Sequence, residues 1–267
     1  MKREEIKQYW DNRAREQGLD PAATTDDVYL RELEIATLID TLKELDLSKD
    51  ALVLDVGCGD GYSTLRVAAD FPQLRFSGVD YSADMIARAQ RQLQSDSLSS
   101  EHIRFAVGDV TKLGEALGQQ LFDVAISDRC LINLESQEIQ ASAIGQIANH
   151  LKPGGYYIAI ENFIEGHDNM NRARHALGLP EIPVRWHNLY FDDASHSKMR
   201  EPYFKLVTAK DFSSSYYFAT RVVYSAMCKE TGEKIDYRHP IHRLAPRLPW
   251  TGQFSPVRMI VLQRRGH

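Results

Sequence analysis

Short apolar runs alternate with amphipathic stretches over the first 160 residues of the chain. Five runs have the length and composition of buried strands, and strands are expected at 51–56, 74–80, 103–107, 122–127 and 156–160. Stretches with helical spacing lie between or before them, at 28–45, 63–71, 83–94, 112–117 and 137–150. Strands that alternate with helices in this way predict a parallel sheet with helices on both faces and right-handed crossovers.

The pattern changes at both ends of the chain. Residues 2–17 have helical spacing outside the core pattern, which predicts either a helix packed on the sheet or a lid over a ligand. After residue 163 a long insertion follows the fifth strand, at the edge of the sheet where a ligand is expected. Insertions at that place typically form substrate pockets. Further helices are expected at 168–177, 215–229 and 239–248, and strands at 203–212 and 256–264. The sequence thus predicts four segments: 1–27, an N-terminal helix or lid; 28–163, a ligand-binding core; 164–203, a substrate-cap insertion; and 204–267, which completes the sheet and adds helical cap elements.

Three alternating glycines, Gly57, Gly59 and Gly61, separate the first strand from its helix. Glycine allows a positive φ and lets a ligand approach the main chain closely. Asp55 stands two residues before the first glycine, where an acid repels phosphate and suits an ammonium group. The Gly-x-Gly-x-Gly spacing also differs from the dinucleotide fingerprint, which disfavours a nicotinamide oxidoreductase.

Two more acids follow strands. Asp80 ends the second strand 23 residues after Gly57, the separation at which a strand-end acid binds ribose hydroxyls. Asp109 follows the third strand. Because parallel strands end at one edge of a sheet, the sequence predicts a ligand cleft there.

The segments 55–61, 78–80, 108–110 and 151–155 resemble, in order and spacing, the motifs of class I S-adenosylmethionine (SAM)-dependent methyltransferases. The resemblance covers roughly residues 30–165. It implies a Rossmann-like, seven-stranded, mostly parallel sheet whose last strand is antiparallel, with SAM as the cofactor. It further implies that the three glycines lie under the methionyl part, that Asp80 holds the ribose and that Asp109 holds the adenine amino group. The other expected cofactor contacts are Asp55, Tyr81, Val110, Ser127, Tyr9 and Trp10.

Methyl transfer from a sulfonium requires alignment above all, and a base only if the acceptor must lose a proton. Candidate catalytic residues are His187, Glu161 and Asp128, with His167 as a further base. His187 could instead bond to nearby backbone, and Asp128 could pair with Arg129 to hold the loop. The expected substrate-binding residues follow the fourth and fifth strands or lie in the insertion: Arg129, Asn133, Asn162, Arg172, Arg185 and Trp186.

Charge is unevenly distributed. Residues 1–160 carry 16 Lys and Arg against 26 Asp and Glu, whereas residues 161–267 carry 16 against 11. The basic part is either a solvated face or a surface that favours an anionic or polyhydroxylated substrate. Nucleic acid is not expected, since no cluster of Lys and Arg with interleaved aromatics stands out.

The remaining composition narrows the class of protein. An apolar content of 43% can fill a core, and the absence of a long apolar run and the charged N-terminus predict a cytoplasmic protein with no membrane partner. Three widely spaced cysteines predict reduced thiols, and no metal-ligand spacing occurs.

We therefore expect an enzyme that methylates a small polar or anionic molecule, on oxygen rather than nitrogen, in natural-product or envelope-sugar metabolism. The alternatives are an RNA or protein methyltransferase and a non-catalytic SAM-binding regulator. The sequence is compatible with a homodimer.

Overall fold

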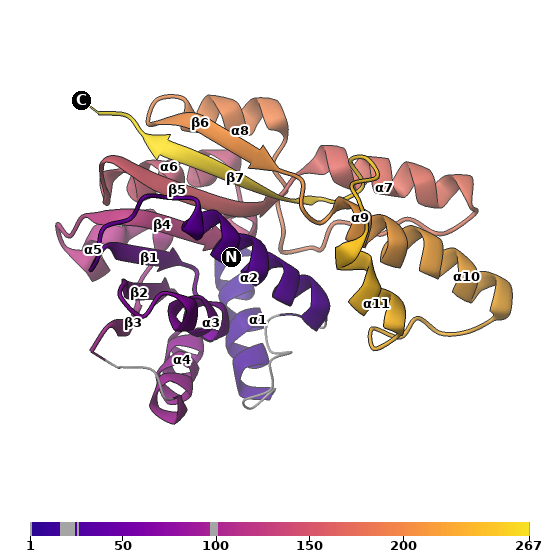
Figure 1. Cartoon of the computed structure of the whole chain (residues 1–267), viewed down its shortest axis with the longest axis horizontal. Coiled ribbons are helices and arrows are strands. Elements are labelled where there is room, and N and C mark those ends of the chain that lie inside the picture. Colours follow the sequence, from indigo (N-terminus) through magenta and orange to yellow (C-terminus); the bar gives the residue numbers. More distant parts are fainter. Residues whose placement is uncertain (1, 17–24, 26, 97–100, 267) are drawn as a thin grey trace.

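Seven strands form one sheet in the computed structural model, which describes residues 2–16, 25, 27–96 and 101–266 (Figure 1). The strand order is β3-β2-β1-β4-β5-β7-β6. The first five strands run parallel, and β7 is antiparallel to both β5 and β6, which confirms the predicted sheet. The strands are β1 (Leu52–Val56), β2 (Arg75–Asp80), β3 (Ile103–Val107), β4 (Phe122–Asp128), β5 (Leu151–Asn162), β6 (Phe204–Lys210) and β7 (Val257–Arg264).

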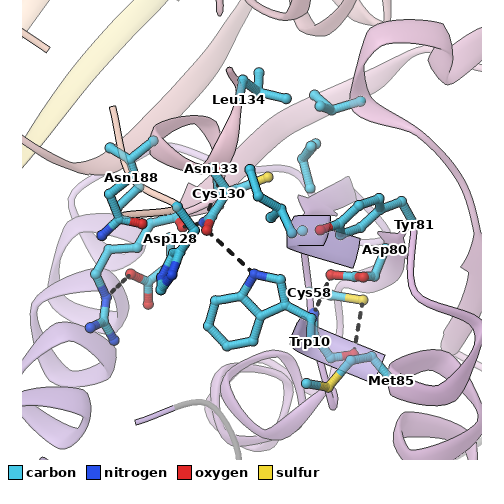
Figure 2. A pocket seen from close by; sticks show the side chains of 18 of the residues that line it. Trp10, Cys58, Asp80, Tyr81, Met85, Asp128, Cys130, Asn133, Leu134 and Asn188 are labelled. Atoms are coloured by element: carbon cyan, nitrogen blue, oxygen red, sulfur yellow. Dashed lines mark hydrogen bonds and ion pairs between the residues drawn. The ribbon is translucent and has the colours of Figure 1, made fainter. Parts of the chain in front are cut away.

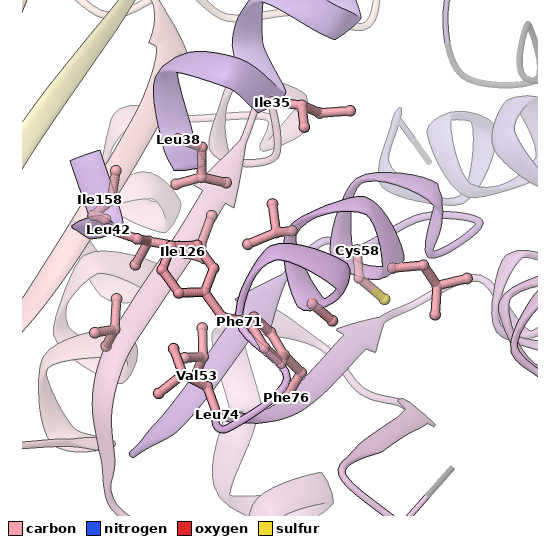
Figure 3. Packing of buried hydrophobic residues seen from close by; sticks show 14 of the residues in the cluster. Ile35, Leu38, Leu42, Val53, Cys58, Phe71, Leu74, Phe76, Ile126 and Ile158 are labelled. Carbon is pink, nitrogen blue, oxygen red and sulfur yellow. The ribbon is translucent and has the colours of Figure 1, made fainter. Parts of the chain in front are cut away.

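Helices cover both faces of the sheet. One core cluster joins apolar residues of α2, α3 and α4 to the sheet, and it includes Leu38 and Leu42 of α2 and Phe71, which follows α3 (Figure 3). The other joins α5 and α6 to the opposite face, through residues such as Ile144 and Ile147. The helices are α1 (Lys2–Glu16), α2 (Val28–Lys43), α3 (Tyr62–Asp70), α4 (Ala83–Ser95), α5 (Leu113–Leu117), α6 (Gln137–Asn149), α7 (Ile164–Ala176), α8 (Asp193–Arg200), α9 (Ser214–Tyr217), α10 (Tyr224–Thr231) and α11 (Pro240–Leu244).

Side-chain caps fix where the helices beside the sheet's ligand edge begin. Asp27 accepts a hydrogen bond from the Leu30 amide at the start of α2, and Ser82 accepts one from the Met85 amide at the start of α4. Each cap satisfies a backbone N–H that has no partner inside the helix. The ends of α2 and α4 are therefore fixed next to the strand tips.

The C-terminal helices lie beyond the strand ends (Figure 1). A π-helical segment, Phe218–Val223, joins α9 to α10, so that one helical stretch runs through residues 214–231. Its Tyr216 hydroxyl donates to the Asp27 carboxylate at 2.6 Å, and Arg221 forms an ion pair with the same carboxylate. The N-terminal cap of α2 thus holds the C-terminal helices against the core.

Several boundaries differ from those expected from the sequence. Residues 152–155, expected as a turn, lie inside β5, where the pairing with β4 shifts register and Gly154 has a φ of 79°. Helix α7 begins directly after β5 rather than at residue 168, and α8 was not expected. The Pro153-Gly154-Gly155 stretch is thus accommodated by an irregularity in the strand pairing instead of an open turn.

Within the part of the chain that the structure describes, no helix has the length and apolar content needed to cross a membrane.

Candidate active site

A cavity of about 260 Å³ opens at the carboxyl ends of the parallel strands. Its wall is built from α1, the glycine loop, the ends of β2 and β3, the segment after β4, and residues 185–190. Figure 2 shows Trp10 of α1 between two groups of side chains, one containing Asp80 and Tyr81 and the other containing Asp128 and Asn188. The cavity therefore has two ends, which we call the acid cradle (Asp55, Asp80, Asp109) and the acceptor end (Asp128, Asn162, 185–190).

The glycine loop has the predicted conformation, and the structure adds a further reason for glycine in it. Gly57, Gly59 and Gly61 have φ values of 73°, 53° and 77°. A Cβ on Gly57 would lie 2.4 Å from Cys130 Sγ, and one on Gly61 would lie 2.8 Å from the Ala89 Cβ. The positive φ expected from the sequence is confirmed, and the protein's own packing gives a second reason for glycine at Gly57 and Gly61.

Asp80 joins β2 to the glycine loop. Its carboxylate accepts hydrogen bonds from the Ser82 amide at 2.8 Å and the Gly59 amide at 3.1 Å. Burial nevertheless raises its pKa to about 6. Asp109 accepts a bond from the Thr111 amide at 2.9 Å and pairs with Arg3 of α1.

Asp55 lies under the glycine loop, 7% exposed, and accepts a hydrogen bond from Thr64 Oγ1 at 2.5 Å. Burial, followed by the nearby charges of Asp128 and Asp80, raises its pKa to about 7. The hydroxyl of Tyr81, which also lines the cavity, is buried without a hydrogen-bond partner. Crowded carboxylates with raised pKa values favour a cationic ligand and disfavour a phosphate. The residues present therefore fit the ammonium and sulfonium groups of SAM.

Helix α1 lies along the edge of the cavity. Trp10 Nε1 donates to Asn133 Oδ1 at 3.3 Å, and the Ser82 hydroxyl donates to Asp11. Tyr9 does not line the cavity but stacks on His187 with a ring separation of 4.7 Å. These contacts place α1 where a lid would lie, and closure over a ligand stays a prediction.

Arg129 follows β4 in a left-handed backbone conformation, with a φ of 50°. Its Nη2 lies 2.9 Å from Glu34 Oε2, and its Nε lies 3.6 Å from Asp128 Oδ1. Glu34, on α2, is fully buried. Burial raises the pKa values of both Glu34 and Asp128, while Arg129 opposes the rise. Asp128 and Arg129 therefore pair, which is one of the two alternatives predicted from the sequence. Both residues also line the cavity.

Glu161 does not open onto the cleft, and the expectation that it does is wrong. The side chain is fully buried and accepts hydrogen bonds from Ser127 Oγ at 2.8 Å and the Leu131 amide at 3.0 Å. Burial raises its pKa to about 7. Neither Glu161 nor Ser127 lines the cavity, so both support the segment after β4 from below.

The segment 185–190 forms the far wall. His187 is 3% exposed, and burial, with the charge of Arg185 next, lowers its pKa to about 4, so the ring is neutral near pH 7 and a weak base. Trp186 points outward at 53% exposed and contacts Tyr9. His167 is buried against Tyr190 and does not line the cavity.

Most of the predicted site residues meet at this cavity. Those that line it are Trp10, Asp55, Gly57, Gly59, Asp80, Tyr81, Asp109, Val110, Asp128, Arg129, Asn133, Asn162, Arg185 and His187. Those that do not are Tyr9, Gly61, Ser127, Glu161, Arg172 and Trp186. Arg172 is on the exposed side of α7 and bonds Asn169, because the helix turns its other face to the protein.

Sequence reasoning missed a buried polar stripe on α2. Asp27, Arg31 and Glu34 are 5%, 5% and 0% exposed, and Arg31 pairs with Asp60 of the glycine loop at 3.0 Å. Their spacing places all three on one helix face. The sequence contains this spacing, but the apolar residues of α2 predict a different buried face, so the buried polar residues were not predicted. Among the described residues no group of three His, Cys, Asp or Glu side chains could hold a metal ion.

Known proteins share this architecture. Residues 47–178 match a family model described as a methyltransferase domain. A malonyl-[acyl-carrier protein] O-methyltransferase from Halalkalibacterium halodurans is 25% identical over 54% of this chain and 53% of its own. A trans-aconitate 2-methyltransferase from Deinococcus radiodurans is 33% identical over 39% of this chain and 35% of its own. The chain thus spans about half, or less, of the length of these curated relatives.

A solved structure supports the fold over nearly the whole chain. N-methyltransferase NodS from Bradyrhizobium japonicum, in complex with S-adenosylhomocysteine, superposes with a TM-score of 0.59 at 15% identity over 98% of this chain and 99% of that one. The sheet order, the antiparallel β7 and the acid-rich glycine loop define the class I SAM-dependent methyltransferase fold. Residues 47–178, which match the methyltransferase domain, contain the glycine loop and the strand-end acids of this fold.

Proposed function

We propose that the protein is a SAM-dependent methyltransferase that transfers a methyl group to an oxygen of a small polar or anionic molecule. The observation that carries the proposal is the acid cradle, in which Asp55 and Asp80 have raised pKa values beside a glycine loop. A curated relative named as an O-methyltransferase supports oxygen as the acceptor atom.

The cradle residues divide the cofactor between them. Asp55 and the backbone of Gly57 and Gly59 would hold the methionyl part, Asp80 the ribose hydroxyls and Asp109 the adenine amino group. A carboxylate that accepts from a diol forms charge-assisted bonds worth roughly 1.5–3 kcal/mol each. When bound, the cofactor supplies a methyl group whose bond to sulfur breaks as the bond to the acceptor forms.

The acceptor end supplies orientation and a proton acceptor. Asp128 lines the cavity with its pKa raised by burial, so it is a better base than an exposed aspartate. His187, neutral and weakly basic, is suited to hydrogen bonding rather than to proton abstraction. Trp10 of α1 bonds Asn133 at the edge of the cavity, where α1 would cover a bound ligand and limit the entry of water.

The cavity extends past the cradle to Asn188 and Tyr190, which supports an enzyme over a non-catalytic regulator, since a regulator needs no room beyond the sulfonium. No observation favours an RNA or protein substrate.

Calorimetric titration with SAM and S-adenosylhomocysteine tests the proposal. We expect micromolar affinity for both, and loss of binding in Asp80→Ala. Asp70→Asn, at the exposed end of α3, is the matched control and should bind as the unmodified protein does. Equal binding by Asp80→Ala, or no binding by the unmodified protein, would contradict the assignment.

A further inference from the structure

Besides Asp128 Oδ1, which lies 3.6 Å from Arg129 Nε, three atoms at the acceptor end have no hydrogen-bond partner. They are Oδ1 of Asn162, Oδ1 of Asn188 and Nδ1 of His187, each on a residue that lines the cavity. Asn162 and His187 are only 5% and 3% exposed. Buried polar atoms in proteins are nearly always satisfied, so three orphans on one wall indicate a ligand that supplies their partners.

Tyr190 orients the two amides. Burial raises its pKa, and the side-chain hydrogen bonds of Asn162 and Asn188 to its hydroxyl oppose that rise. The unpartnered atom of each asparagine side chain is its oxygen, Oδ1. The carbonyl oxygens of both asparagines are therefore left as acceptors, and they require a donor.

Two classes of acceptor molecule do not match these unpartnered atoms, a carboxylate or phosphate because of its hydrogen-bonding groups and an ammonium because of its charge. A carboxylate or phosphate has no donor to offer to the amide oxygens. An ammonium group has donors, but the guanidinium groups of Arg129 and Arg185 line the same end of the cavity and repel a cation. A neutral hydroxyl group both donates and accepts hydrogen bonds and carries no charge, so neither argument excludes it.

Aromatic rings border the same space. Trp10, Tyr190 and Tyr217 all line the cavity. Their faces offer apolar area while their polar tips bond elsewhere, as the Trp10 indole does with Asn133. Such walls suit a ring that has C–H faces and hydroxyl edges.

We infer that the acceptor end binds a neutral polyhydroxylated ring, a sugar or cyclitol, whose hydroxyls donate to Asn162 and Asn188 and bond to His187. The inference rests on the proposed function and narrows its substrate class. The methylated hydroxyl forms its new bond to the methyl carbon as the carbon–sulfur bond breaks, and its proton passes to Asp128.

Saturation-transfer NMR on protein saturated with S-adenosylhomocysteine tests this substrate class. The neutral probes are methyl glycosides of hexoses and 6-deoxyhexoses and myo-inositol, and the anionic probe is tricarballylate, all at millimolar concentration. We expect transfer to at least one neutral ring and none to tricarballylate. Asn162→Leu and, separately, Asn188→Leu should weaken that binding about tenfold, as the loss of one hydrogen bond predicts.

Two controls keep the outcomes separate. Asn149→Leu, at the exposed end of α6, should bind as the unmodified protein does, and both test variants should retain affinity for S-adenosylhomocysteine, which reports a folded cradle. The inference would be overturned if no neutral ring received saturation transfer. It would also be overturned if tricarballylate received saturation transfer that was lost in Arg185→Ala. Failure of the unmodified protein to bind S-adenosylhomocysteine would instead overturn the proposed function.

The product gives a second measurement. With radiolabelled SAM and a ring that binds, label should enter an ether that mild alkali does not cleave. Release of the label as methanol would identify an ester, and hence a carboxylate acceptor, and would contradict the inference.

Discussion

The fully buried Glu34 carboxylate on α2 and the Arg129 guanidinium after β4, whose side chain is 26% exposed, form an ion pair with 2.9 Å between Oε2 and Nη2. The two residues are 95 positions apart in the chain. Arg129 has a left-handed backbone, a conformation that is unfavourable for a non-glycine residue and persists only where neighbours enforce it. The pair therefore fixes the side chain that borders Asp128 at the acceptor end.

Glu34→Gln should destabilise the protein by about 2–3 kcal/mol, since removal of one partner leaves a largely buried charge. Asp128 remains beside Arg129 and limits the loss. Urea unfolding measures the effect. Glu32→Gln is the matched control, because the Glu32 pair with Arg66 is exposed and should change stability by at most about 1 kcal/mol. Equal effects of the two variants would mean that the Glu34 pair is not a buried anchor.

Asp55 should make the protein less stable as pH rises. Its pKa is about 7 in the fold, above the ordinary value of 3.8, so the folded state holds a proton that the unfolded state releases. This contribution is complete at acid pH and is lost as pH rises through 7. Relative to the unmodified protein, Asp55→Asn should gain about 2–3 kcal/mol of stability between pH 5 and pH 8. A pH-independent difference in urea unfolding would show that Asp55 ionises normally.

Binding of SAM should show the opposite dependence on pH. A cationic ligand favours ionised Asp55 and Asp80, so binding releases protons and the affinity falls as pH drops below about 7. Calorimetry in two buffers of different ionisation enthalpy measures the proton release, and Asp55→Asn should reduce it. Equal apparent enthalpies in both buffers would rule out this linkage.

Gly57→Ala should destabilise the glycine loop by about 1–3 kcal/mol because of its positive φ, before any clash is counted. The added Cβ also meets Sγ and Cβ of Cys130, and Cys130→Gly removes both atoms, so it should restore part of the loss in the double variant. Gly114→Ala in α5 is the control, since nothing lies near its Cβ position and alanine favours a helix. Thermal unfolding that ranks the two glycine variants equally would contradict the packing argument.

The glycine loop and the acids at the strand ends were predictable because they depend on local pattern and on the common edge of a parallel sheet. Asp80 and Asp109 required no knowledge of distant contacts. The role of Glu34 was not predictable, since a buried charge is defined by a partner far along the chain. Glu161 was misjudged because its place at a strand end suggested the cleft, whereas its side chain turns beneath the segment after β4 and bonds the Leu131 amide.

Arg3 of the N-terminal helix pairs with Asp109, and Asp11 of the same helix bonds to Ser82 beside Asp80. The helix is therefore fastened to the rim on which an adenosyl group is expected to settle. We expect that S-adenosylhomocysteine can be exchanged for SAM only when these two contacts of α1 are broken. We therefore expect a substitution at Arg3 to change the rate at which S-adenosylhomocysteine is released, although Arg3 does not contact the reacting atoms.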